Sequence, residues 1–116
     1  MGVYFLRRGE PPATTIAVTI TGSGDSNRCY AIINGTKQYS AGTHEVNAGD
    51  TITFGVYGRN STNYGAVTID GTRVLKVTNE KTKTYDWTVP SGISTIEIDL
   101  ETAKSFSYGR ITVTTA

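Results

Sequence analysis

Apolar and polar residues alternate with a period of two along most of this chain. In residues 15–21 and 51–57 every second side chain is Ile, Val or Phe, and the positions between them hold Thr, Ala, Gly or Tyr. Strand side chains point alternately to opposite faces, so this pattern is typical of a strand with one buried face. Residues 96–100 repeat it with Ile and Leu set between Glu and Asp. We therefore predict a series of strands whose apolar faces share one core.

Turn sequences separate these alternating windows. Asn34-Gly35 and Asp70-Gly71 are strong hairpin signals, because both central positions of such a turn require positive φ. Turns recur about every 8–12 residues, which is the spacing of a sandwich or barrel. No window has helical periodicity, and residues 79–83 predict a charged loop. The sequence thus predicts an all-β fold, an antiparallel β-sandwich of about seven to nine strands.

The predicted core consists of the apolar side chains on the inward faces of these strands. We expect the following residues to be mainly buried: Ile16, Val18, Ile20, Ile32, Ile52, Phe54, Val56, Val67, Ile69, Trp87, Ile98, Ile111 and Val113.

The first residues of the chain do not share this pattern. Pro11-Pro12 forbids a helix or a central strand and favours an extended segment. We therefore divide the chain into an extended N-terminal arm at 1–12 and a β-sandwich domain at 13–116. The arm holds three consecutive large apolar residues, so we expect it to dock, either as an edge strand of its own domain or on a neighbour. The candidate assembly contacts are Tyr4, Phe5, Leu6, Arg7 and Arg8.

Charge and composition exclude several classes of function. The chain has 11 Lys and Arg against 10 Asp and Glu, so no basic excess favours nucleic acid or a membrane surface as partner. It has one cysteine and one histidine, which allows no internal disulfide and no site that needs two of either residue. The arginines follow the short apolar run at residues 3–6, the reverse of a secretory signal. We expect a protein made in the cytoplasm without a signal peptide.

Residues that could carry chemistry all have an ordinary structural interpretation. Cys29 is a small apolar strand residue of the core, and Glu97 and Asp99 form the solvent face of a half-buried strand. Residues 24–27 offer oxygen ligands in a loop, but one carboxylate is too few for calcium. We expect no enzyme activity, no catalytic residue, no metal and no cofactor.

Three tyrosines are candidates for contact with a glycan. Tyr64 and Tyr108 each precede a glycine beside a loop rich in Asn or Ser, at one end of the predicted sandwich. If Tyr39 joined them in one exposed patch, the three rings would form a platform for sugars. Aromatic residues are also favoured in strands for packing alone, so a structural role is the alternative.

Several segments resemble known protein families. Residues 43–54, THEVNAGDTITF, resemble a segment common in bacterial and phage Ig-like sandwich domains, and residues 85–92 resemble their later strands. The whole chain is similar to small proteins encoded in virion gene clusters of tailed bacteriophages and prophages of Gram-positive bacteria. Residues 4–12, 29–36 and 63–69 carry that similarity.

The resemblance implies an Ig-like antiparallel β-sandwich and a non-enzymatic role in the virion. It implies a capsid decoration or a tail or baseplate accessory, with other virion proteins or copies of the chain itself as partners in a homo-oligomer. It assigns no catalytic residue. The alternative is a carbohydrate-binding or adhesion module that contacts host or mucus glycans.

Overall fold

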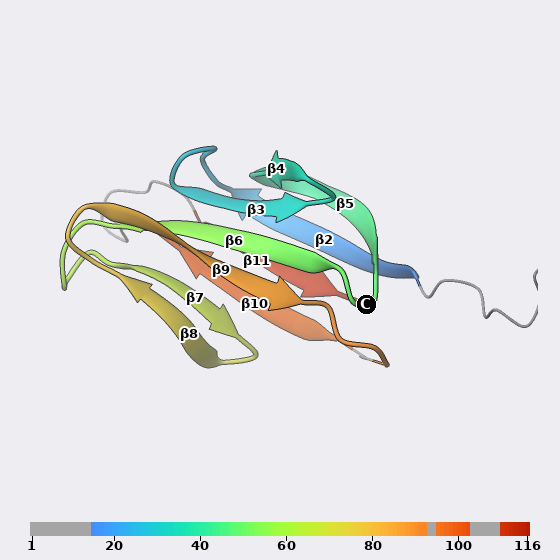
Figure 1. Cartoon of the computed structure of the whole chain (residues 1–116). Coiled ribbons are helices and arrows are strands. Elements are labelled where there is room, and N and C mark those ends of the chain that lie inside the picture. Colours follow the sequence, from blue (N-terminus) through green and yellow to red (C-terminus); the bar gives the residue numbers. More distant parts are fainter. Residues whose placement is uncertain (1–14, 93–94, 103–109) are drawn as a thin grey trace, which may run out of the picture.

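The computed structural model describes residues 15–92, 95–102 and 110–116. The N-terminal arm, with its candidate contacts Tyr4, Phe5, Leu6, Arg7 and Arg8, lies outside these residues, and so does Tyr108. Within them the chain forms ten strands in two antiparallel sheets and no helix, as Figure 1 shows. The prediction of an all-β antiparallel sandwich is confirmed.

The two sheets differ in size. In spatial order the larger sheet contains β5 (Ser40–Asn47), β2 (Thr15–Ser23), β11 (Arg110–Thr115), β10 (Ile96–Glu101), β7 (Gly65–Ile69) and β8 (Thr72–Val77). The smaller sheet contains β4 (Thr36–Gln38), β3 (Cys29–Ile33), β6 (Thr51–Gly58) and β9 (Lys81–Thr88). Strands β4 and β5 are separated by Tyr39 alone, so the chain passes from one sheet to the other at that residue.

Ten strands exceed the expected seven to nine. The chain from β4 to β5 contributes a strand to each sheet. Strand β9 is longer than predicted: it begins at Lys81, inside the segment predicted as a charged loop, because residues 81–83 continue the ladder with β6. Only residues 78–80 remain between β8 and β9, and Asn79 and Glu80 both have positive φ there.

The core lies between the sheets, and most of the predicted residues are buried in it. The buried set is Ile16, Val18, Ile20, Ile52, Phe54, Val56, Val67, Ile98, Ile111 and Val113. Ile69 and Trp87 are partly buried and pack against this core, whereas the prediction for Ile32 is wrong, because its half-buried side chain lies on the outer face of β3.

The error at Ile32 concerns which face of β3 turns inward. Ala31 is paired with Phe54 and Cys29 with Val56, so the odd-numbered residues of β3 share the inward face. Ile32 is therefore on the outer face and Ile33 is buried. Trp87 does face inward, opposite Ile52, but β9 is the edge strand of its sheet and leaves one side of the indole uncovered.

Both predicted hairpin turns have the expected backbone. Asn34 and Gly35 have φ of 54° and 81°, and Asp70 and Gly71 have φ of 48° and 83°. Positive φ at both central residues is the signature of the type I′ turn, whose twist matches that of the flanking strands.

We predict that Gly35→Ala and Gly71→Ala each lower the free energy of unfolding by about 1 kcal/mol, through left-handed backbone strain. No atom lies within 4 Å of a Cβ built at either glycine, so the loss contains no clash. Urea unfolding of each variant measures it. Gly35→Asn is the control and should lose less, because Asn tolerates this conformation. Unchanged stability in both alanine variants would contradict the turn assignment.

Candidate functional site

The outer face of the six-stranded sheet carries polar side chains in cross-strand rows. One row runs from Arg73 on β8 through Thr68, Asp99 and Thr112 to Thr21 on β2. Directly paired residues share a face, and the neighbours of this row in sequence are core residues, so the row faces outward. The Thr112 hydroxyl donates a hydrogen bond to Asp99 Oδ1 at 3.0 Å. This face is a polar surface that offers hydroxyls and carboxylates.

A tyrosine with two cations stands at one corner of this face. The Arg73 guanidinium carbon lies 5.0 Å from the centroid of the Tyr64 ring, and Lys76 Nζ lies 4.8 Å from it. Arg73 Nη2 also donates a hydrogen bond to Tyr64 Oη at 3.4 Å. Both cations are thus within cation–π distance of the same half-buried ring. We call Tyr64, Arg73 and Lys76 the Tyr64 cluster.

An irregularity in β8 assembles the Tyr64 cluster. Beyond the Asp70-Gly71 turn, Thr68 is paired with Arg73, but Val67 is paired with Leu75, so Val74 is an extra residue. This β-bulge turns Leu75 inward and places Lys76 opposite Ala66 on the outer face. Without it, Arg73 and Lys76, three residues apart, would point to opposite faces.

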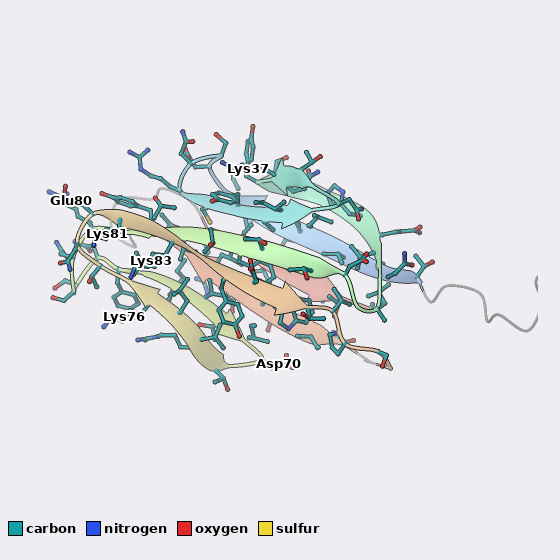
Figure 2. The ribbon with its side chains drawn as sticks, viewed as in Figure 1. Lys37, Asp70, Lys76, Glu80, Lys81 and Lys83 are labelled. Carbon is teal, nitrogen blue, oxygen red and sulfur yellow. The ribbon has the colours of Figure 1, made fainter. Side chains whose placement is uncertain are left out.

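Positive charge continues from the Tyr64 cluster onto β9. Lys81 and Lys83 are exposed, and Figure 2 shows them at the same end of the sandwich as Lys76. Within the described ranges Arg73 and Lys76 contact Tyr64, and neither forms an ion pair with a carboxylate. The edge formed by β8 and β9 therefore carries four cations, Arg73, Lys76, Lys81 and Lys83, with the exposed Glu80 between the two strands.

The structure does not bring the predicted tyrosines Tyr39 and Tyr64 together. Tyr39 joins β4 to β5, and its side chain is 42% exposed. Tyr64 precedes β7, which lies four strand positions from β5 across the larger sheet, about 19 Å at the usual strand spacing. Among the described residues, which leave out Tyr108, Tyr64 has two cations beside it, and Tyr39 lies on the opposite side of the larger sheet.

The other candidate residues have the local contacts of ordinary structure. Asp25 Oδ1 accepts the backbone N–H of Asn27 at 2.8 Å, which makes an Asx turn of the loop before β3. Cys29 is fully buried, and its Sγ donates to the Leu100 carbonyl oxygen at 3.8 Å. Burial raises the pKa of this thiol to about 11. The described residues contain no group of three or more His, Cys, Asp or Glu able to hold a metal ion.

Sequence reasoning missed Arg73 and Lys76. The Asp70-Gly71 turn could have supplied a signal, because a two-residue hairpin fixes the pairing of Arg73 with Thr68. The position of Lys76 depends on the bulge, which no turn residue or glycine in β8 announces.

In the described parts of the chain, no helix is both long and apolar enough to cross a membrane. No family model, curated protein or solved structure matches the chain.

We predict that stability falls as the pH rises from 9 to 11, in part because Cys29 ionises. Its pKa is 9.0 ordinarily and about 11 in the fold, so the buried thiol contributes fully below pH 9 and loses its contribution as pH approaches 11. The loss attributable to Cys29 should be about 2–3 kcal/mol. Urea unfolding at pH 8 and pH 11 measures it. The Cys29→Ala variant should show a shallower decline over this range, and an equal decline would contradict the assignment.

Proposed function

We propose that this chain is a non-enzymatic structural protein of a bacteriophage virion, either a capsid decoration or an accessory of the tail or baseplate. Two observations support the proposal. The first is the resemblance of residues 4–12, 29–36 and 63–69 to small sandwich proteins of tailed phages. The second, which carries it, concerns the strand edges of the described part of the sandwich. The edges on one side have features that prevent pairing with another chain, and we call it the guarded side; an edge on the other side is suited to strand addition.

The guarded side consists of the edge strands β8 and β9. Exposed strand edges invite pairing with other chains, and proteins prevent it with bulges and with lysines, including inward-pointing ones. Strand β8 has the bulge described above. On β9, Lys81 and Lys83 are paired with Gly58 and Val56, which places them in register with the inward face of the smaller sheet. This side disfavours strand addition.

The opposite side contains β5, which is the edge strand of the larger sheet. Ala17 exchanges backbone hydrogen bonds with Ala116 at 3.0 and 3.1 Å, on the side of β2 away from β5. Glu45 is the β5 residue paired with Ala17, so the N–H and carbonyl of Glu45 point away from β2. In agreement with this direction, Asn34 Nδ2 donates a hydrogen bond to the Glu45 carbonyl oxygen at 3.0 Å. Backbone groups of every second residue in a strand point to the same side, so the N–H and carbonyl of Thr43 also point to the outer edge of β5, the edge away from β2.

The outer edge of β5 suits an added strand. Residues 40–43 are Ser, Ala, Gly and Thr, all exposed and uncharged, and none of the described strands pairs with this edge. An extended peptide can extend such an edge through main-chain hydrogen bonds. The absence of charge and of bulky side chains from these four residues leaves the backbone accessible to it.

We propose residues 3–6 of a neighbouring copy as that peptide. They form an apolar run of the same length as the accessible stretch of β5. A neighbour's arm can pair antiparallel, the more stable arrangement. Copies joined in this way would form the homo-oligomer expected in a particle.

Particle composition tests the virion role. In gradient-purified particles of a phage or prophage that encodes the chain, we expect mass spectrometry to find it in fixed proportion to the major capsid or tail protein. A chain that begins at Ala13 should stay folded and be missing from the particles, because it lacks the arm. Absence of the full chain from intact particles would overturn the virion proposal.

Strand addition at β5 has its own test. Thr43→Pro removes an N–H that points away from β2, so stability should change by less than about 1 kcal/mol, since edge strands tolerate such a proline. Self-association, measured by analytical ultracentrifugation, should be lost. Thr43→Ala is the matched control, because it loses the same side-chain contact with Thr19 and keeps the N–H. Equal association of both variants would contradict pairing at this edge.

Glycan binding remains the alternative function. A platform shared by Tyr39 and Tyr64 has no support from their placement, since the two lie on strands far apart in the sheet. The observation that favours glycan binding is instead the Tyr64 cluster.

A further inference from the structure

We infer that the Tyr64 cluster binds an anionic glycan, a polysaccharide whose sugars carry carboxylate, phosphate or sulfate groups. The inference gives the glycan-binding alternative a site and a ligand class, and it does not depend on the virion proposal. It rests on the bulge in β8, on the charge balance around Tyr64 and on the polar rows beside it.

The bulge is the first step of the argument. It interrupts the β7–β8 ladder and leaves Val74 without a partner residue in the register. Bulges frequently re-aim a side chain next to a binding site. Here the consequence is that Lys76 joins Arg73 on the outer face, beside one tyrosine ring. Regular pairing would have kept the two cations on opposite faces.

The charge balance is the second step. Two cations close to one ring repel each other, and no carboxylate of the described residues pairs with either of them. The acidic residues nearest to the cluster on the same face lie on β10, where Asp99 accepts the Thr112 hydroxyl, and Glu45 lies at the far edge on β5. Thr68 lies between Asp99 and Arg73 in the register. Arg73 has donors to offer a ligand anion, and a guanidinium matches carboxylate, phosphate and sulfate groups.

The neighbouring rows decide the class of macromolecule. Glu101 is paired with Ala66, and Asp99 is paired with Thr68. These two carboxylates lie on β10, which is next to β7 and two strand positions from the cations on β8. Carboxylates accept hydrogen bonds from sugar hydroxyls but repel a row of phosphates. A duplex nucleic acid laid across this face would bring its phosphates onto them. A glycan that carries both hydroxyls and anionic groups complements both parts of the surface.

Tyr64 positions the two cations that would meet such a ligand. Its ring is half-buried, its hydroxyl accepts a hydrogen bond from Arg73, and both cations lie over the ring. A ligand at this corner would therefore contact Arg73 and Lys76 rather than a bare aromatic face. Lys81 and Lys83 on β9 add positive charge at the same end of the sandwich, where Glu80 contributes one negative charge (Figure 2).

Binding of defined polymers to the full chain tests the inference. We would titrate polygalacturonate, a phosphomannan and dextran sulfate, whose sugars carry carboxylate, phosphate and sulfate groups respectively, with dextran as the neutral polymer and duplex DNA as the competing class. At least one anionic glycan should bind and dextran should not. Raising the salt from about 50 mM to about 300 mM should weaken the interaction.

The R73Q/K76Q double variant should lose at least about tenfold in affinity for the polymer that binds. The matched control is Lys37→Gln, which removes a cation 4.5 Å above the buried Tyr30 ring on the other sheet and should bind within about twofold of the unmodified chain. Urea unfolding checks that all variants are folded. The inference is overturned if no anionic glycan binds, if duplex DNA binds more tightly than every glycan, or if Lys37→Gln weakens binding as much as the double variant.

Discussion

Burial of one face of each sheet against the other is the constraint on which every exposed feature of this sandwich depends. Side chains alternate along a strand, so fixing Ile98, Leu100 and Ile111 in the core fixes Asp99 and Thr112 on the surface. A slip of one residue would send each set to the opposite face. The polar rows of the larger sheet are therefore a consequence of the core, and they need no stabilising role of their own.

The two surfaces of interest arise where this regularity is interrupted or ends. The bulge in β8 changes the phase of the alternation and brings Lys76 to Arg73. At Tyr39 the chain leaves the smaller sheet and enters the larger one, which makes β5 an edge strand whose residues 40–43 are uncharged. The bulge interrupts the β7–β8 ladder, and none of the described strands pairs with the outer edge of β5. Such departures are expected at sites kept for contact with other molecules.

The sequence predicted the parts of the fold that local chemistry determines. The Asn34-Gly35 and Asp70-Gly71 turns and the inward faces of β2 and β6 follow from turn geometry and strict alternation. Residues 29–33 are apolar or aromatic throughout, so their periodicity is ambiguous, and only pairing with β6 shows that Ile33 and not Ile32 is buried. The candidate site was harder to predict from the sequence. Tyr64 stood out, but its partners depend on a bulge that is fixed by packing between strands.

The two proposed surfaces are separated in a way that lets one copy use both. Strand β5 begins the order of the larger sheet and β8 ends it, so a strand added to β5 would leave the Tyr64 cluster uncovered. Figure 1 shows β5 and β8 on opposite sides of the sandwich. A copy anchored through β5 would thus present its cations away from the anchor. An exposed site of this kind binds weakly as a single unit, but linked copies can raise the overall affinity roughly 10²–10⁴-fold when their sites engage one polymer together. The two proposals, assembly through β5 and glycan binding at the Tyr64 cluster, are therefore compatible, because assembly would supply the multivalency that glycan binding requires.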